Sequence, residues 1–367
     1  MPDTLRRDSY ELEEQSDGRL RLVDPVALGR AVDDLAATFP ADYRADAFRA
    51  RLQALAEAGL RDAELLVVTH VDRDHIEGVL ALLQDAACPV KFKEVWFNGY
   101  DHLDEESPPS FGAVQGERLT GLLASSGRWN RAFAGRAVSI ENAPTPVGLA
   151  GGLTLRVLSP SRKKLRTLLH DWELECRNAE LIPGEPTSFA EPLSLESFGS
   201  VDVAALAAAP FRQDTAPANG SSIALLLEWQ GRRVLLGADA HPELLCKTLT
   251  PYAVNGRVAL DAIKVPHHGS KGNLSPDLVK LVDCPQWLIS TNGNYFKHPD
   301  DEAIARIIVG ATAPELIFNY SSPQNKVWDD DALRAEYQYT TRYLRPGEAA
   351  VCLEARSGPP SGGSPSR

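Results

Sequence analysis

The sequence has no long hydrophobic run. None of its apolar stretches approaches the roughly 18 residues that suit a transmembrane helix, so we expect no membrane-spanning segment. Residues 1–7 are polar and lack the apolar core of a signal peptide. The five cysteines are scattered and form no close Cys-x-x-Cys pair, which argues against a cysteine zinc site and predicts reduced thiols. Together these absences predict a cytoplasmic protein.

Positive charge is also in short supply. The chain has 38 Lys and Arg against 50 Asp and Glu, a net charge of −12, so its surface as a whole repels a long polyanion such as duplex DNA. Bound divalent cations would reverse that sign locally. With 43% hydrophobic residues in 367, the chain can bury a large core, as expected for one or two globular domains.

Metal-binding side chains gather in residues 69–75. His70, Asp72, Asp74 and His75 supply two imidazoles and two carboxylates. They follow a short apolar run that predicts a buried strand, and they precede an apolar pattern with helical spacing. Open α/β sheets bind ligands at the carboxyl ends of their strands, and zinc and related metals use these donors. The alternative, a solvated turn that happens to carry two histidines, explains less of the pattern.

Two later strands end in similar chemistry. Residues 223–229 and 233–236 predict a β-hairpin around Gln230-Gly231, and Asp239 follows the second strand. A carboxylate at the end of a buried strand needs a cation or many hydrogen bonds. The strand at residues 262–265 leads to two adjacent imidazoles, His267 and His268. Neighbours on an extended chain point in opposite directions, so we expect one to face a metal. We favour His267 and keep His268 as its rival.

Two further histidines lie in loops. His298 closes the loop that follows an apolar strand at residues 287–290, and its position alone leaves its role open. His102 lies in a polar, Pro-containing loop, and we expect it on the surface.

These motifs resemble the metallo-β-lactamase superfamily, in particular the branch of the metallo-hydrolase domain of the competence protein ComEC. The resemblance rests on His-x-Asp-x-Asp-His at 70–75, Gly-x-Asp at 237–239, Lys-Val-Pro-His-His-Gly-Ser at 264–270 and His-Pro at 298–299. As in that branch, Asn219-Gly220-Ser221-Ser222 replaces the usual third-motif histidine. The resemblance implies an α/β fold, an αββα sandwich of two mixed sheets flanked by helices.

The resemblance also implies roles for individual residues. Two divalent ions, zinc or manganese, would be held with one cation on His70 and Asp72, the other on Asp74 and His75, and Asp239 between them. His267 or His268 would complete the second. We expect the following metal ligands: His70, Asp72, Asp74, His75, Asp239 and His267. We expect catalytic roles for Asp74, His298 and His268, and substrate contacts from Asn219, Ser221, Ser270 and Asn292. Such a pair of cations lowers the pKa of a shared water and yields hydroxide at neutral pH.

The domain organisation follows from these matches. Residues 1–45 lack the family's Gly-Asp and Asp-Gly-Gly elements and form an altered start of the fold, although residues 9–13 and 20–23 predict a hairpin. Residues 46–355 form the hydrolase domain, and 356–367 a disordered tail. Within the domain, residues 46–58 predict a helix, Ser275-Pro276 predicts the start of another, and residues 349–353 predict a strand. The segment 160–217 is an insert of helix and loop. Its basic residues Arg162, Lys163, Lys164 and Arg166 predict a solvated helix face, with an arm that contacts phosphates as the alternative.

The sequence therefore predicts a metal-dependent hydrolase that cleaves phosphodiester bonds, a nuclease or nucleotide phosphodiesterase with nucleic acid or a nucleotide as substrate. Hydrolysis of a carboxylic ester, lactone or amide on the same metal site is one alternative, and a non-catalytic metal-binding scaffold is another. The residues identify no protein partner.

Overall fold

A computed structural model describes residues 5–7, 10–14, 20–22, 49, 52–57, 59–104, 114–124, 126–169, 201–291, 293, 297–344 and 353. These residues form a mixed α/β structure around an eight-stranded mixed sheet. Its strands are β6 (Val147–Gly148), β7 (Thr154–Ser159), β8 (Ala224–Trp229), β9 (Arg232–Leu236), β11 (Ala262–Lys264), β13 (Gln286–Ile289), β14 (Glu315–Phe318) and β15 (Thr340–Tyr343). Across the sheet the order is β15-β14-β13-β11-β9-β8-β7-β6. Strands β9 to β15 run parallel, and β6 to β9 are antiparallel neighbours.

The predicted hairpin is confirmed as β8 and β9. Leu226 pairs with Leu235, and the connection is Gln230-Gly231. Both turn residues have positive φ, 48° and 78°, as expected for a two-residue turn that matches the twist of the strands. This hairpin leads the chain to Asp239.

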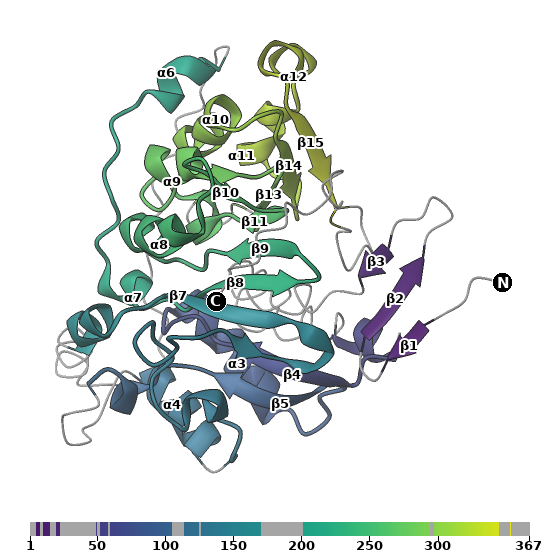
Figure 1. Ribbon diagram of the computed structural model, residues 1–367, viewed down its shortest axis with the longest axis vertical. Helices are drawn as coiled ribbons and strands as arrows, with labels where there is room; N and C mark the ends of the chain where they lie inside the picture. Colours follow the sequence, from purple (N-terminus) through teal and green to yellow (C-terminus); the bar gives the residue numbers. More distant parts are fainter. Residues whose placement is uncertain are drawn as a thin grey trace.

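A second, smaller sheet packs against the first. It consists, in the described part of the chain, of the parallel strands β4 (Asp62–Val67) and β5 (Lys91–Trp96). One face of the pair shares a core with the large sheet, and Trp96, Leu155 and Leu225 belong to that one cluster. The other face packs on helices α3 (Arg73–Gln84) and α4 (Val114–Ala124). Figure 1 shows these strands and helices together in the lower part of the molecule.

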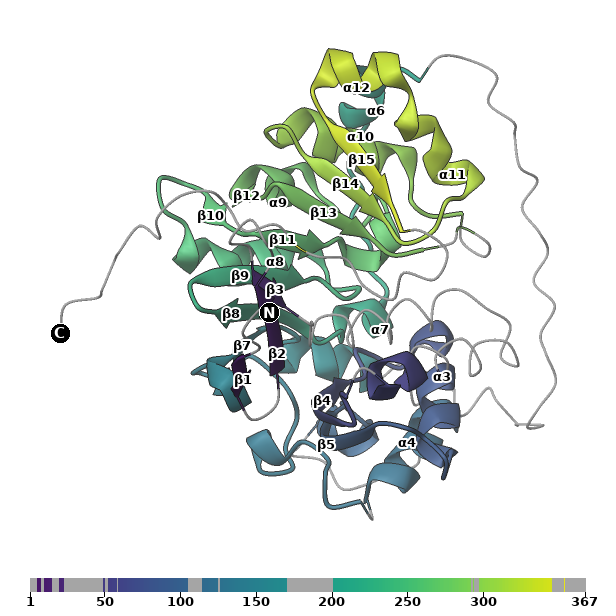
Figure 2. The same ribbon diagram turned by 90° about the vertical axis from the view of Figure 1, so that its right-hand side faces the viewer.

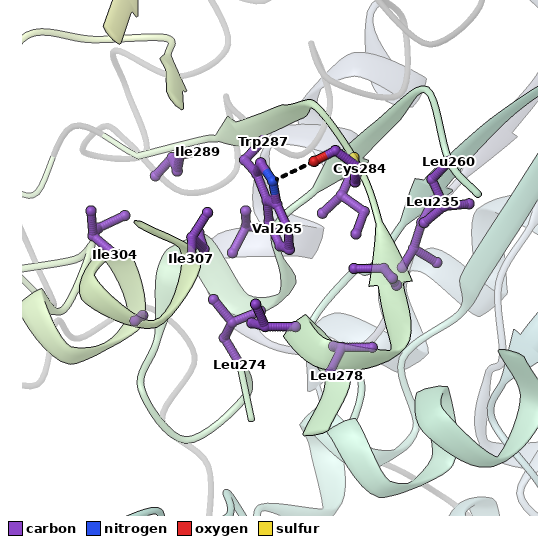
Figure 3. Close-up of a cluster of buried hydrophobic side chains, with 14 of the residues drawn as sticks. Leu235, Leu260, Val265, Leu274, Leu278, Cys284, Trp287, Ile289, Ile304 and Ile307 are labelled. Carbon is purple, nitrogen blue, oxygen red and sulfur yellow. Dashed lines mark hydrogen bonds between the residues drawn. The ribbon is translucent and has the colours of Figure 1, made fainter. Parts of the chain in front are cut away.

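Helices also cover the far face of the large sheet. These are α8 (Pro242–Leu249), α9 (Pro276–Leu281) and α10 (Asp301–Gly310). Figure 3 shows Trp287 of β13 at the centre of this core, with Ile304 and Ile307 of α10 beside it. The indole Nε1 of Trp287 donates to the Cys284 carbonyl at 3.0 Å, which satisfies its one buried polar group.

Shorter elements complete the fold. They are β1 (Leu5–Arg7), β2 (Tyr10–Glu14), β3 (Leu20–Leu22), β10 (Val258–Ala259), β12 (Val282–Asp283), α6 (Val203–Ala207), α7 (Pro217–Gly220), α11 (Pro323–Lys326), α12 (Asp331–Tyr337), and the 3₁₀ turns η1 (Tyr100–His102), η2 (Arg131–Phe133), η3 (Ala150–Gly152), η4 (Thr250–Tyr252), η5 (Pro266–Gly269) and η6 (Val327–Asp329). Figure 2 shows α12 and β15 at the end of the molecule opposite β5 and α4.

Several local predictions are confirmed. Strands β2 and β3 pair as an antiparallel hairpin. The hydroxyl of Ser275 accepts from the Leu278 amide and caps α9, with Pro276 at its first position. Residues 52–57 and 162–169 are helical. The strand predicted at residues 349–353 and most of the insert, residues 170–200, lie outside the described residues. No described helix combines the length and apolar character needed to cross a membrane.

One histidine prediction is wrong. His102 is buried rather than exposed, with 6% of its surface accessible. Its Nδ1 accepts from the Gly99 amide at 3.1 Å, and its Nε2 lies 3.0 Å from the Gly135 carbonyl. Its ring packs edge-on against Trp129. The polar sequence of this loop suggested that His102 is exposed. The imidazole can be buried because backbone groups satisfy both of its nitrogens.

Candidate metal centre

Parallel strands bring the candidate residues to one edge of the large sheet. Asp239 follows β9, His267 and His268 follow β11, and His298 lies in the loop after β13, and these three strands are adjacent and parallel. Their carboxyl ends therefore meet at the same edge. The second sheet contributes His70 after β4. The carbonyl of Thr69 accepts from the Ile223 amide just before β8 at 2.9 Å, which ties the ends of the two sheets together.

The helix after β4 presents three of the four side chains in the 70–75 motif. Asp72 occupies the N-cap position of α3, and Asp74 and His75 lie in its first turn. His70 continues the buried run of Val68 and Thr69, at 3% exposure, while the Asp72 side chain is 41% exposed. The motif therefore runs from the protein interior to the surface within three residues.

Asp239 lies at the centre of the imidazoles. Its Oδ2 is 3.3 Å from His75 Nε2, 3.6 Å from His267 Nε2 and 3.8 Å from His70 Nε2. The residue is almost fully buried, at 2% exposure. Three imidazole nitrogens from two separate segments thus face a single carboxylate oxygen.

Two groups of ligand atoms can each hold a metal ion. One is His70, His75 and Asp239, and the other is Asp74, His75 and His268; within each group the atoms lie within 4.8 Å of one another. His75 belongs to both. The donors therefore divide differently from the sequence-based pairing of His70 with Asp72. Asp72 lies at the edge, with Oδ2 3.4 Å from His70 Nε2.

Each imidazole is oriented through its other nitrogen. The Thr69 hydroxyl lies 3.1 Å from Nδ1 of both His70 and His75. Nδ1 of His268 lies 2.6 Å from the Ser290 carbonyl, which can only accept, so this nitrogen carries the proton. The Nε2 lone pair of neutral His268 then faces His75 Nε2 at 3.4 Å. Metal-binding histidines are commonly held by such hydrogen bonds at the second nitrogen.

The backbone at the two adjacent histidines is not extended. His267 has φ 45° and ψ 54°, and His268 has φ 54° and ψ 17°, so both are left-handed. The argument that neighbours point in opposite directions fails, because it assumed extended chain. His268 joins one of the two ligand groups, while His267 approaches Asp239 from another side. Left-handed non-glycine residues cost roughly 1–2 kcal/mol each, and such strain is often found at functional sites.

Burial and charge fix the protonation of the central groups. Burial disfavours ionisation of Asp239, but attraction from His267 and His75 outweighs it and holds its pKa well below the usual range. Burial, together with the charge of Lys264, lowers the pKa of His268 far below its ordinary value. Burial opposes protonation of His267, but Asp239 and the polar groups of Asp214 and Asn273 raise its pKa to about 9. At neutral pH the centre thus holds an ionised carboxylate and at least one neutral imidazole.

The arrangement fits a divalent cation. Asp239 Oδ1 and His70 Nε2 are buried, and neither makes a hydrogen bond to any other described group. Buried polar atoms normally have partners, and leaving one without costs about 1–3 kcal/mol. A cation bound between them would satisfy both. Imidazoles and carboxylates are the donors that zinc prefers, and manganese also accepts them.

The residues predicted to contact substrate lie beside the cluster. The Asn219 amide donates to Asp214 Oδ2 at 2.7 Å, and the Ser221 hydroxyl donates to the Ala218 carbonyl at 2.6 Å. The Ser270 hydroxyl accepts from the Gly272 amide at 3.3 Å. These bonds stabilise the loops around the centre. Asn292 lies outside the described residues, and substrate contact by the other three stays a prediction.

His298 lies next to the cluster. Its ring centroid is 5.3 Å from that of His267, and its Nδ1 is 3.6 Å from Asp300 Oδ1. Asp300 Oδ2 accepts from the Lys271 amide at 2.8 Å, so the carboxylate is held in place by the loop after His268. The position agrees with a role near substrate, which itself stays a prediction.

The basic residues of the insert are largely engaged within the protein. Lys164 donates to Glu243 at 2.7 Å and lies 2.8 Å from His241 Nδ1. Arg166 lies 3.3 Å from Asp104, and Arg162 donates to Asn142 at 3.0 Å. Arg162, Lys163 and Arg166 are nevertheless exposed, as predicted for a solvated helix face, and phosphate contact stays a prediction.

Sequence reasoning missed several residues that hold the centre together. Thr69, Asp214, Asn273 and the Ser290 carbonyl each contact a candidate ligand or its partner. Thr69 alone carried a signal, since it directly precedes the motif.

The comparisons with known proteins add no family to this geometry: the chain matches no protein-family model, and no curated protein is significantly similar to it.

Proposed function

We propose that the chain is a metal-dependent hydrolase that binds two divalent cations, zinc or manganese, and cleaves phosphodiester bonds. The observation that carries the proposal is the convergence of His70, His75 and His267 on the buried carboxylate of Asp239, with His268 in contact with His75. The two ligand groups share His75, so two cations would lie close together. The sequence resemblance to metallo-β-lactamase-like hydrolases of the ComEC branch and the packing of two sheets between helices support the same proposal.

The residues divide into roles under this proposal. His70 and Asp239 would hold one cation, and Asp74 and His268 the other, with His75 joining one of the two because its single Nε2 lone pair can bind only one cation. When bound, such a pair supplies Lewis acidity and activates water as a nucleophile. Asp72 would contact the first cation from the exposed side of the site. His298 would donate a proton to the leaving oxygen, since it lies beside the cluster without belonging to either ligand group.

Elemental analysis and substrate hydrolysis test the proposal. Purified protein should contain about two divalent ions per chain, and Asp239→Ala should lose most of them, since that carboxylate belongs to one group and faces the other. The metal-loaded protein should hydrolyse bis-p-nitrophenyl phosphate or oligonucleotides faster than lactones and amides. Asp261→Ala is a matched control, because this carboxylate precedes β11 at the opposite end of the strand that leads to His267. Failure of the wild type to bind zinc or manganese would contradict the proposal, and preferential lactone hydrolysis would reassign the substrate.

A further inference from the structure

We propose that Asp214 is a positioning residue of the candidate metal centre, acting through the Asn273 amide to hold His267 with Nε2 toward Asp239. The significance of this role for activity rests on the proposed function. The hydrogen-bond chain itself is independent of any cation.

Asp214 is held by three accepted hydrogen bonds. Its Oδ1 accepts from the Ala216 amide at 2.8 Å, and its Oδ2 accepts from Asn219 Nδ2 at 2.7 Å and from Asn273 Nδ2 at 2.9 Å. Its own backbone amide donates to the Gly272 carbonyl at 3.0 Å. The carboxylate is therefore fixed between α7 and the loop that carries Asn273.

These contacts determine which way the Asn273 amide points. Nδ2 of Asn273 donates both to Asp214 Oδ2 and, at 3.0 Å, to the Asp239 carbonyl. A carboxylate and a carbonyl can only accept, so the NH₂ group must lie on that side. The amide oxygen then faces Nδ1 of His267 at 2.9 Å. Asp214 thus helps to determine which atom of the Asn273 amide faces His267.

The amide in turn fixes the imidazole. Because the Asn273 oxygen can only accept, Nδ1 of His267 carries the hydrogen, and in the neutral ring Nε2 is left with its lone pair. That nitrogen lies 3.6 Å from Asp239 Oδ2, on the side of the ligand cluster. Asp214 Oδ2 also lies 3.7 Å from Nδ1, which adds electrostatic attraction for the same hydrogen. Without Asp214, only the Asp239 carbonyl still accepts from the Asn273 NH₂ group, so the amide turns more readily and presents that group to the ring in part of the molecules.

The hydrogen bonds that lead from Asp214 through Asn273 to His267, called the relay below, act on a residue with a strained backbone. His267 has a positive φ of 45°, although its amide donates to the Ala238 carbonyl at 2.8 Å. An imidazole on a strained turn has no intrinsic preference for facing Asp239. The hydrogen bond from its ring to Asn273 supplies that preference.

The tautomer of His267 tests the relay without any cation. In chelator-treated protein labelled with ¹⁵N-histidine, the measurement is made at a pH above the His267 pKa of about 9, because below it the ring carries a hydrogen on both nitrogens. Under those conditions long-range ¹H–¹⁵N correlation distinguishes Nδ1–H from Nε2–H in the neutral ring. Wild type should hold Nδ1–H, and Asp214→Ala should populate both tautomers. Asp214→Asn keeps one oxygen that can accept from Asn273 and should lie between them. Asp261→Ala removes a carboxylate that accepts from the Arg233 amide at 2.8 Å, and should leave the tautomer unchanged.

Competition with a chelator, using zinc alone as the probe, gives the second readout. Residues that orient metal ligands typically change affinity by about 10- to 100-fold, so Asp214→Ala should weaken zinc binding by that factor, with a smaller loss in Asp214→Asn. Asp261→Ala should lower folding stability but not affinity. If Asp214→Ala does not fold, Asp214→Asn decides.

The outcomes are distinguishable. The relay would be overturned if Asp214→Ala kept the wild-type tautomer and the wild-type zinc affinity, and the proposed function would stay intact. If only Asp214→Asn folds, the same result in that variant would overturn the relay. A wild type that holds Nδ1–H on His267 but binds no zinc would contradict the proposed function and still support the relay. Equal losses in Asp214→Ala and Asp261→Ala would show general destabilisation and overturn the relay.

Discussion

Nε2 of His268 lies 3.4 Å from Nε2 of His75, although the two residues are 193 positions apart in the chain. His75 is in the first turn of α3, beside the small sheet, and His268 follows a strand of the large sheet. The Nδ1 hydrogen of His268 is committed to the Ser290 carbonyl, so its Nε2 meets His75 as an acceptor. This contact joins the two halves of the candidate centre.

The Thr69 hydroxyl should control cation affinity. It contacts Nδ1 of both His70 and His75 at 3.1 Å, so Thr69→Val, which keeps the shape, removes both orienting contacts. We expect zinc affinity to fall by about 10- to 100-fold, measured by chelator competition. Thr69→Ser retains the hydroxyl and should stay near wild type. Equal affinities of the two variants would show that the hydroxyl does not orient the ligands.

His298→Ala should separate proton donation from metal binding. The ring lies next to His267 but outside both ligand groups, so we expect the variant to keep its cations. Turnover of a phosphodiester with a poor leaving group should fall by about 10²–10⁴-fold, the usual contribution of a general acid. The loss should be much smaller for p-nitrophenolate, which departs without a proton. Equal loss on both substrates would assign His298 to positioning, and loss of cations would make it a ligand.

His102→Ala should reduce stability without affecting cation content. The change removes hydrogen bonds to the Gly99 amide and the Gly135 carbonyl and leaves a cavity beside Trp129. Together these effects should lower the free energy of unfolding by about 2–4 kcal/mol, measured by urea denaturation. A loss of bound zinc in folded His102→Ala would instead link this histidine to the metal centre.

Alkaline pH should weaken the fold through Cys246. Burial, with repulsion from Asp277, raises the pKa of this thiol to about 11. The folded state therefore disfavours the thiolate. The contribution of the neutral thiol to the free energy of unfolding is complete below about pH 8.5 and is lost as pH rises through about 11. We expect about 1 kcal/mol of lost stability from this group after solvent screening. Unfolding curves of wild type and Cys246→Ala should converge over this range, and parallel pH dependence would contradict the assignment.

Local signals were sufficient for much of the fold. The alternation and the Gln230-Gly231 turn predicted β8 and β9, because two residues with positive φ close a hairpin only in a narrow set of sequences. Ser275 followed by Pro276 predicted the start of α9 for a similar reason, since both residues act on their own helix turn. Structures of this kind depend on interactions between residues that are close in sequence, so they can be predicted from neighbouring residues.

The same reasoning could not give the geometry of the candidate centre. No neighbouring residue signals that His267 and His268 are left-handed; that conformation depends on contacts such as the one between His268 and Ser290, 22 positions away. Asp214 was missed because its partner Asn273 lies 59 positions away, and because it sits in a stretch without periodicity. Residues that bind directly form recognisable motifs, whereas residues that orient them depend on the tertiary structure.

The Thr69 carbonyl, which accepts from the Ile223 amide, places the 70–75 segment at the junction of two sheets. Donors from both sides of that junction meet only after the sheets have docked, so neither the unfolded chain nor one isolated sheet presents the full ligand set. Cation capture would then be a late event in folding, and release would require the sheets to separate locally. A chelator should accordingly speed unfolding more than it slows refolding, because a cation that binds after the folding transition state stabilises only the native state.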